Sequence, residues 1–397
     1  MRITFAGISQ GKEEIDAVMR VLESKWHANG YECDTLEKEL ASYIGTPYAC
    51  VVNSGSSANL LAIKALELPQ GSKVLTSGCG FPATLFPIIH AGHKPVLVDY
   101  ELPSHNIDLD QVEQELKNND IRAIIIAHTM ANPVDMNRLM TMASFHSVPV
   151  IEDCCEALGS RINGKLVGSF GDFGTFSFYP SHQINGMGGG GAVTCKSKDH
   201  ALKLRSMREW GKIIELDFAG DHHTKPTNEI DGIPYDSHYT YITQGFNFKY
   251  PDVNCAYTRV QLDRLKGFIG DRQRNHKYLA EKMNKFKKYF MPMKVIEGAE
   301  LANFGYTLTL SKLAPFSRDE LLEYLEEHEV GTRLFFAGNI TRHKPFRHLY
   351  KEFPVADYTM KNSMFVGCWH GLELSDMEYI YQTIGRFIDE HCGSRGR

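Results

Sequence analysis

Short apolar runs alternate with segments of helix length through the first two-thirds of the chain. The apolar runs are almost continuous, which is typical of strands whose two faces are both covered. Helix-length segments at 56–67 and 135–147 separate some of these runs. Because strand, helix and strand follow one another at this spacing, we predict an α/β fold with a large, mostly parallel sheet between helices. The predicted strands are residues 73–78, 94–100, 122–129, 148–154, 174–179 and 191–195.

The rest of the chain has a different pattern. Residues 220–239 are polar and lack periodicity, which indicates a connection that is either functional or mobile. Apolar positions at helical spacing then predict a long helix near 251–286, leading into a smaller α+β unit. We therefore predict two domains, a large α/β domain at residues 1–262 and a small C-terminal α+β domain at 263–397.

The composition argues against several classes of protein. The 397 residues carry a net charge of -5, with a pI near 6.4, whereas a nucleic-acid binder needs a basic face. No apolar run approaches the roughly 20 residues that span a bilayer, and the start does not resemble a signal peptide. We expect a cytoplasmic protein that binds neither nucleic acid nor membrane. The nine cysteines are scattered without a CxxC pair, so we expect neither a disulfide framework nor a zinc ribbon.

In such a sheet ligands bind at the carboxyl ends of strands, so the residues after each run are the candidates for chemistry. "NSGSSANLL" (53–61) places Ser56 and Ser57 at the start of a helix, where hydroxyls and free N–H groups bind phosphate. An ordinary helix cap is the alternative. "GFPATLF" (80–86) offers Phe81, which could stack on a flat ring or pack in the core.

Two further strand ends carry polar groups. "VIEDCCEALGS" (150–160) ends an apolar run with Asp153, and Glu156 follows three residues later. A buried carboxylate needs a partner, which could be a protonated pyridine nitrogen, an arginine or a metal ion. "SFYPSH" (177–182) places Ser177 five residues before His182. Phosphate, flat ring, ring nitrogen and reactive carbon are the four groups of pyridoxal phosphate that these motifs together would serve.

With these motifs the chain resembles the sugar-nucleotide aminotransferase family, which has the aspartate-aminotransferase fold (fold type I), from about residue 20 to about residue 350. In that family a lysine that holds the cofactor covalently normally stands at the position of His182. Histidine there, with "SFYPSH", "ANPVD" (131–135) and "GTRLFFAGN" (331–339), resembles the dehydratase branch that includes GDP-4-keto-6-deoxymannose 3-dehydratase. The resemblance implies that the large domain binds pyridoxal or pyridoxamine phosphate, and that the protein is a homodimer with shared active sites.

The resemblance also implies roles for single residues. Asp153 would pair with the pyridine nitrogen, Glu156 would lie near the ring hydroxyl, and Phe81 would stack on the ring. His182 would be the sole acid and base, because imidazole forms no stable imine and leaves the cofactor bound non-covalently. The phosphate would be held by Ser56, Ser57, Ser177 and, from the neighbouring subunit, Asn247.

The reaction implied is loss of the C3 hydroxyl from a nucleotide-linked 4-keto-6-deoxyhexose, which gives a 4-keto-3,6-dideoxyhexose for deoxysugar biosynthesis, as in lipopolysaccharide O-antigen. Glutamate is the expected amine donor. This chain departs from the branch in two places. After the histidine the branch reads "MGEGGAV", whereas this chain reads "NGMGGGGAV". The CDP-4-keto-6-deoxyglucose 3-dehydrase of this branch carries clustered cysteines for an iron–sulfur centre after the segment that corresponds to "REWG". Residues 196–254 of this chain contain no cysteine, so we expect no such cluster.

Four residues are candidates for contact with the sugar nucleotide: Trp26, His222, Lys225 and Arg333. Arginine suits a diphosphate, but a solvated loop would explain Arg333, and core packing would explain Trp26. His222, His223 and His238 match no zinc motif, so we expect no metal site. Two other functions would use the same motifs. A sugar-nucleotide 4-aminotransferase would ordinarily need lysine at position 182, and a catalytically silent protein would only bind the sugar nucleotide.

Overall fold

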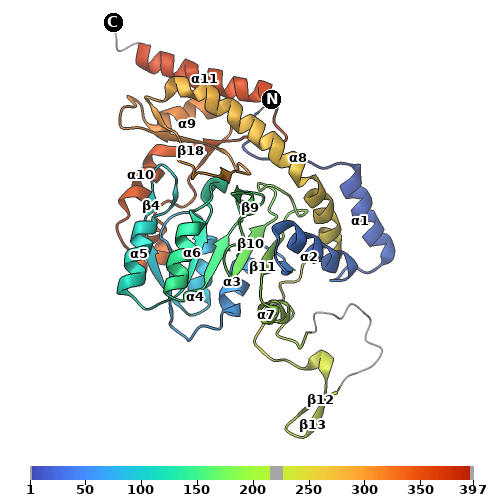
Figure 1. Ribbon diagram of the computed structural model, residues 1–397. Coiled ribbons are helices and arrows are strands. Elements are labelled where there is room, and N and C mark those ends of the chain that lie inside the picture. The colour runs from blue at the N-terminus through green and yellow to red at the C-terminus, as the bar shows by residue number, and fades with distance from the viewer. Residues whose placement is uncertain (1, 215–226, 394–397) are drawn as a thin grey trace.

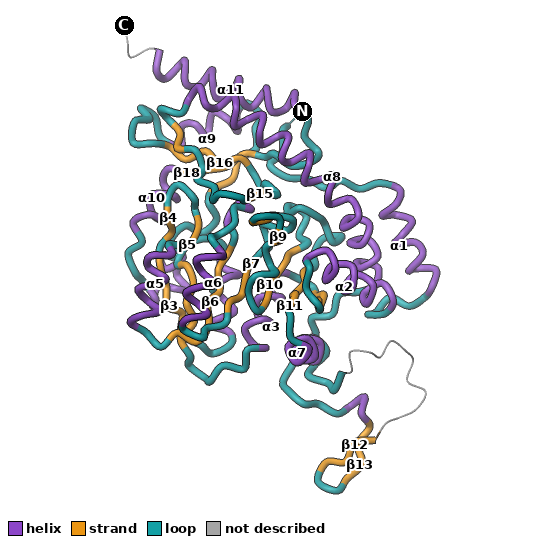
Figure 2. Tube along the Cα trace, in the orientation of Figure 1, coloured by secondary structure: helices purple, strands orange, loops and turns teal. Residues whose placement is uncertain are grey.

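The computed structural model describes residues 2–214 and 227–393. These residues contain a seven-stranded sheet, seen at the centre of Figures 1 and 2, with the order β1-β11-β10-β7-β6-β2-β3. β11 runs antiparallel to both of its neighbours, and the other strands are parallel to one another. In this order the strands are Tyr48–Val52, Gly191–Cys195, Phe173–Ser177, Val150–Asp153, Ile121–Ala127, Lys73–Ser77 and Lys94–Val98.

Helices cover both faces of this sheet, as the continuous apolar runs predict. The covering helices are Gly55–Ala65 (α3), Phe86–His90 (α4), Leu109–Asn118 (α5), Met136–Phe145 (α6) and Lys198–Arg208 (α7). In β6, Ile124 and Ile126 pack with α5 and α6, whereas Ala123 and Ile125 pack with α3, α4 and α7. Successive side chains of a strand point to opposite faces, so a strand between two helical layers is apolar at every position.

The C-terminal part has its own sheet and core. Its four strands pair antiparallel in the order β14-β16-β18-β17. Their core also contains residues of α9, α11 and the end of α8. The elements are Phe290–Met291 (β14), Tyr306–Leu310 (β16), Ser363–Val366 (β18), Thr332–Leu334 (β17), Arg318–Glu327 (α9), Leu374–Gly393 (α11) and Asp252–Met283 (α8).

The long helix α8 connects the two parts. Its first half packs on Lys12–Ser24 (α1) and Tyr31–Ile44 (α2), and its end lies in the C-terminal core. The helix continues through position 262, so the division into residues 1–262 and 263–397 stays a prediction.

All six predicted strands are present, with ends within two residues of the predicted ones, and so are the three predicted helices. The strand of the seven-stranded sheet that the pattern missed is β1, whose run "YACVV" is short and begins with a half-buried tyrosine. None of the helices in the described ranges combines the length and the hydropathy that a membrane crossing requires.

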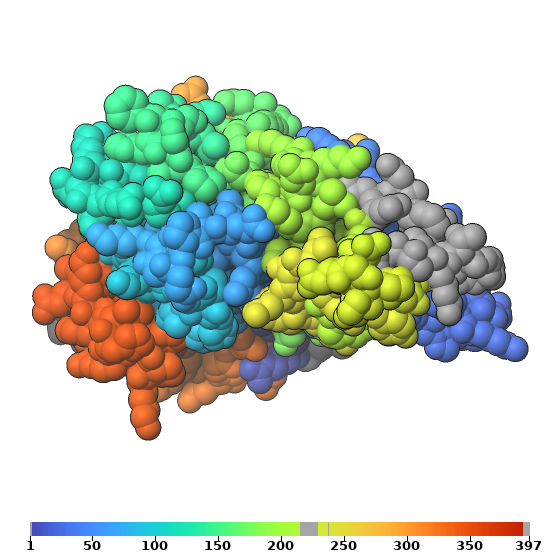
Figure 3. Space-filling view, turned by 90° about the horizontal axis from the view of Figure 1, so that it is seen from below, coloured from blue at the N-terminus to red at the C-terminus, as the bar shows by residue number. Residues whose placement is uncertain are grey.

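The polar stretch after α7 contains regular structure where it is described. β12 (Thr227–Ile230) and β13 (Ile233–Asp236) form a hairpin that projects from the body in Figure 1 and stands in yellow on the face seen in Figure 3. The remaining elements are Tyr100–Glu101 (β4), Asn106–Ile107 (β5), Arg161–Ile162 (β8), Lys165–Leu166 (β9), Ala299–Glu300 (β15), Pro354–Asn362 (α10) and the 3-10 turns Pro82–Thr84, Thr129–Ala131, Ser237–Tyr239, Asn284–Phe286, Ile340–Arg342 and Lys344–Leu349.

Candidate active site

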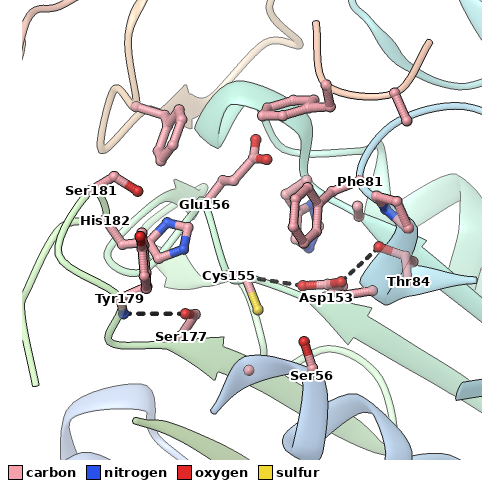
Figure 4. Close-up of a pocket in the computed structure, with 18 of the residues that line it drawn as sticks. Ser56, Phe81, Thr84, Asp153, Cys155, Glu156, Ser177, Tyr179, Ser181 and His182 are labelled. Atoms are coloured by element: carbon pink, nitrogen blue, oxygen red, sulfur yellow. Dashed lines mark hydrogen bonds between the residues drawn. The ribbon is translucent and has the colours of Figure 1, made fainter. Parts of the chain in front are cut away.

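A cavity of about 770 Å³ lies where the parallel strands end and the C-terminal part covers them (Figure 4). Ala127 of β6, Asp153 of β7 and Ser177 of β10 line it, and each is the last residue of its strand. A parallel sheet binds ligands at this edge, and the volume suits a small organic molecule. The C-terminal part contributes Phe304, Arg333, Phe336 and Phe365.

The amino end of α3 faces the cavity. Ser54 caps the helix, because its Oγ accepts a hydrogen bond from the Ser57 N–H at 3.1 Å. The Ser57 hydroxyl donates to Asn53 Oδ1 at 2.7 Å and does not line the cavity, whereas Gly55 and Ser56 do. Free N–H groups and the positive end of the helix dipole make this terminus suitable for an anion.

Two glycines let the main chain approach closely at this end of the cavity. A Cβ on Gly55 would come within 2.7 Å of Cys155 Sγ and 2.8 Å of Ser177 Cβ. Gly190 has a φ of +109°, and a Cβ there would lie 2.6 Å from the Tyr250 ring. The Tyr250 hydroxyl also donates to a carbonyl of the same glycine-rich turn at 2.6 Å. The turn that departs from the pattern of the dehydratase branch is therefore held by Tyr250.

Asp153 is fixed by three hydrogen bonds at the end of β7. Its Oδ2 accepts from Asn59 Nδ2 and from Thr84 Oγ1, both at 2.8 Å. Its Oδ1 accepts from the Cys155 N–H at 3.1 Å (Figure 4). An ionised carboxylate offers about four acceptor positions, so Asp153 can also accept from a donor in the cavity.

Glu156 points into the cavity from the turn after β7 (Figure 4). Its Oε2 accepts a hydrogen bond from the Met130 N–H at 2.7 Å. Burial raises the pKa of Glu156 to about 8, the Met130 bond opposes that rise, and the negative charge of Asp153 adds to it. At neutral pH most Glu156 carboxyls therefore carry a proton, which can be donated in a hydrogen bond to an oxygen in the cavity.

His182 reaches the cavity from the turn after β10. Its main-chain N–H donates to the Tyr179 carbonyl at 2.9 Å, and its ring lies 5.4 Å from the Phe304 ring, centroid to centroid. Nδ1 is buried and has no hydrogen-bond partner among the described residues. Burial, and secondly the positive charge of Arg272, lower the pKa of His182 to about 3. The imidazole is therefore neutral at physiological pH and able to accept a proton.

Phe81 and Arg333 line the cavity with different chemistry, one with an aromatic ring and the other with a positive charge. The Phe81 side chain is 58% exposed and meets Phe336 only edge-on, with ring centroids 6.4 Å apart, so its ring face is available to a flat ligand. The exposed Arg333 guanidinium lies over the Phe5 ring, 4.5 Å from its centroid, and donates to the Thr332 carbonyl at 2.7 Å. Arg333 thus places a positive charge at the cavity rim.

The structure brings most of the predicted site residues together. Three of the predicted residues do not line the cavity of the single chain: Ser57, Trp26 and Asn247. Trp26 is 61% exposed and donates to the Asn29 carbonyl, and the exposed Asn247 forms a main-chain bridge with Glu209. His222 and Lys225 lie outside the described residues. The predicted residues that line the cavity are Ser56, Phe81, Asp153, Glu156, Ser177, His182 and Arg333.

Several residues of the site were missed by the sequence analysis. His128 and Cys155 line the cavity just after β6 and β7, so a stricter use of the strand-end rule would have found them. Asn59 was visible as a polar residue inside an apolar helical run, where a buried amide needs a partner. Thr84 lies in the motif at 80–86 and could have been found there, whereas Phe304 has no local signal, because only the folded chain brings it to the cavity.

Beside the cavity lies a buried cluster whose ligand types would suit a metal ion. The side-chain donor atoms of His128, Glu152 and Cys154 lie within 4.8 Å of one another. However, the Glu152 carboxylate accepts from main-chain N–H groups at residues 168, 170 and 171, and His128 Nδ1 accepts from the Val134 N–H. These bonds occupy lone pairs that a metal would need. The cluster therefore stabilises β7, the strand that carries Asp153.

The chain is similar in sequence to one group of enzymes over almost all of its length. The sequence profile of the DegT/DnrJ/EryC1/StrS aminotransferase family matches residues 9–385. The lipopolysaccharide biosynthesis protein RfbH of Salmonella typhimurium is 34% identical over 394 residues, which cover 95% of this chain and 90% of RfbH. The dTDP-4-dehydro-2,6-dideoxy-D-glucose 3-dehydratase of Saccharopolyspora spinosa is 33% identical over 392 residues, which cover 95% of this chain and 84% of that protein.

The fold is also similar to that of a solved enzyme. The E. coli GDP-4-keto-6-deoxy-D-mannose-3-dehydratase with bound hydrated PLP matches with a TM-score of 0.86 and 25% sequence identity, over 97% of this chain and 99% of that chain. This likeness confirms the predicted fold, an α/β fold of the aspartate-aminotransferase type (fold type I) with a large, mostly parallel sheet.

Proposed function

The chain belongs to the DegT/DnrJ/EryC1/StrS aminotransferase family, and from this premise we propose that it is a 3-dehydratase dependent on pyridoxal or pyridoxamine phosphate. Its substrate is a nucleotide-linked 4-keto-6-deoxyhexose, and its product is the 4-keto-3,6-dideoxyhexose that results from loss of the C3 hydroxyl. The two dehydratases described above, at 33% and 25% identity, support this reaction. Family membership itself confirms the resemblance that the motifs predicted.

The residues of the cavity fit pyridoxamine phosphate at each of its polar groups. The amino end of α3, with Ser56 and the nearby Ser177, suits the phosphate. Asp153 suits a protonated ring nitrogen, and the protonated Glu156 suits the ring hydroxyl. The exposed face of Phe81 suits the ring. When bound, the cofactor supplies an electron sink for bonds at the carbon next to its amine.

One observation carries the proposal. His182 faces the cavity, and the part of the lining that the structure describes contains no lysine. A lysine amine can both attach the cofactor and move protons, whereas imidazole does only the second. The residues suited to the cofactor are present without the residue suited to tethering it. That combination supports an elimination that depends on proton transfer, rather than ordinary transamination.

The surroundings of His182 keep the imidazole in the neutral form that a base requires, while they lower its affinity for a proton. Because its pKa is lowered to about 3, the ring is neutral at physiological pH and accepts a proton at a ring nitrogen. The imidazolium that forms is disfavoured by burial and by Arg272, so it gives the proton up readily. In this proposal the proton goes to the oxygen that leaves C3.

The substrate and partner assignments extend the same proposal. Arg333, at the rim, suits the diphosphate of the sugar nucleotide. Glutamate is the proposed amine donor that restores the amine form of the cofactor. Asn247, exposed in the single chain, is proposed to reach the phosphate in a second subunit, which would make the enzyme a homodimer with shared sites.

The test is mass spectrometry of reactions that contain the purified protein, pyridoxamine phosphate, glutamate and one nucleotide-linked 4-keto-6-deoxyhexose. GDP-, CDP- and dTDP-linked sugars are tried in turn. We expect one of them to yield a product with one oxygen atom fewer, together with one molecule of 2-oxoglutarate and one of ammonium per turnover. His182→Asn, which keeps a polar side chain but no proton-transfer group, should bind the cofactor and form no product.

Other outcomes would contradict the proposal. A product in which nitrogen replaces the C4 carbonyl oxygen would favour the 4-aminotransferase. Binding of a sugar nucleotide with no product under any condition would favour the silent binding protein. Normal dehydration by His182→Asn would show that another residue moves the proton.

A further inference from the structure

Arg272, on α8, is a buried cation with no carboxylate partner among the described residues. Its side chain is 1% exposed, and it is among the largest fully buried side chains of the described residues. Within the described ranges no Asp or Glu forms an ion pair with it, and its Nε has no hydrogen-bond partner. Burying an unpaired charge is costly, so a role for this guanidinium has to be sought in its remaining contacts.

The guanidinium joins two segments that are far apart in the sequence. Nη2 donates to the His182 carbonyl at 2.8 Å. Nη1 donates to the Asn303 carbonyl at 3.1 Å and to the Phe304 carbonyl at 3.4 Å. His182 carries the imidazole that faces the cavity, and Phe304 carries the ring on which that imidazole packs. The planar guanidinium of Arg272 therefore binds the main chain of both residues whose rings are in contact, His182 and Phe304.

The turn is held from its other side as well. Gln183, the next residue, is fully buried, and its Nε2 donates to the Glu156 carbonyl. The backbone around His182 is thus tied to α8 through Arg272 and to the turn after β7 through Gln183. With both ties in place, the position of the imidazole in the cavity depends on Arg272 and not on the loop alone.

We propose that Arg272 is a positioning residue for His182, whose guanidinium clamps the His182 turn to residues 303–304 and so keeps the imidazole in the geometry that proton transfer requires. The inference rests on the proposed role of His182. The clamp explains why a cation is retained in a buried place that offers it only carbonyl oxygens.

The same contact adds an electrostatic effect. Arg272 on α8 contacts the His182 turn, and the other titratable groups that line the cavity with His182 are Tyr100, His128, Asp153, Cys155, Glu156, Tyr179, Arg333 and His343. Of these, Arg272 lowers the pKa of His182, in addition to burial. Removing the charge while keeping the side-chain volume should therefore raise the pKa of the imidazole.

The first measurement is an NMR titration of the full-length protein labelled at its histidine rings, with the His182 signal assigned by its loss in His182→Asn. In the wild type we expect the ring to stay neutral at pH 5, since its pKa is about 3. In Arg272→Met we expect a rise in the pKa of about one unit or more. Arg274→Met is the matched control, because Arg274 lies on the same helix but is exposed and paired with Asp271.

The second measurement separates position from charge. Arg272→Lys keeps the charge but loses the planar guanidinium whose two Nη atoms donate to the two segments. We expect its kcat to fall by about tenfold while its KM stays within about twofold, because misplacement affects the proton transfer more than substrate binding. Arg274→Met should match the wild type in both constants.

The inference is overturned if Arg272→Met and Arg274→Met give the same titration, or if Arg272→Lys keeps the kcat of the wild type. Arg272→Lys, which keeps the buried charge, is the second variant if Arg272→Met does not fold. The titration needs neither cofactor nor substrate, so it can be done even on a protein that has no dehydratase activity. Absence of that activity would contradict the proposed function, but it would not affect the titration.

Discussion

Replacing Gly55 with alanine tests the close approach of main chain at the amino end of α3. The added Cβ would lie 2.7 Å from Cys155 Sγ and 2.8 Å from Ser177 Cβ, whereas ordinary contacts are 3.4–4 Å. The thiol can rotate away, but Ser177 ends the buried strand β10, so helix and strand have to separate by more than half an ångström. Overpacking of this kind lowers the free energy of unfolding by about 1–3 kcal/mol.

The assay compares urea unfolding of the wild type, Gly55→Ala and Gly267→Ala. A Cβ on Gly267, in α8, would meet nothing within 4 Å, so alanine there should raise the free energy of unfolding by up to about 1 kcal/mol through helix propensity. We expect the free energy of unfolding to fall in Gly55→Ala and to rise in Gly267→Ala. Because Gly55 lines the cavity, its variant should also bind pyridoxamine phosphate about tenfold more weakly or worse in a fluorescence titration. Gly55→Ala that is as stable as Gly267→Ala and binds the cofactor normally would refute the reasoning.

Three other outcomes are expected. His182→Lys should acquire a visible absorption band with pyridoxal phosphate, because an amine would then face the cofactor; a folded variant without the band would show that residue 182 points elsewhere. Asp153→Asn should weaken pyridoxamine phosphate binding by about tenfold in the same fluorescence titration, because the ring nitrogen would lose its charged partner; unchanged affinity would argue against that pairing. His105 is buried and its pKa is lowered to about 3 by burial, so the unfolded state binds more protons and stability is lost as pH falls below 6.5. That loss should reach about 2 kcal/mol at pH 5, and urea unfolding of His105→Gln should show a flatter dependence on pH; equal slopes in the two proteins would contradict it.

The pattern of apolar and polar positions was sufficient for the sheet and for one side of the site. A strand buried on both faces needs an uninterrupted apolar run, and that requirement is local, so the six predicted strands match the structure closely. Because ligands bind where such strands end, Asp153, Ser177 and His182 could be selected before any contact was known. The position of β1 was missed, since five residues with a half-buried start give little periodicity.

The remaining properties of the site depend on segments that are distant in the sequence. Phe304 and Arg333 reach the cavity from the C-terminal part, and Arg272 reaches His182 from α8. Burial in the folded chain raises the pKa of Glu156 and, together with the charge of Arg272, lowers the pKa of His182. Sequence therefore determined which chemical groups stand at the strand ends, because periodicity and turn residues act over a few positions. Only the tertiary structure decided their protonation and orientation, because desolvation and close contact arise when separate segments pack together.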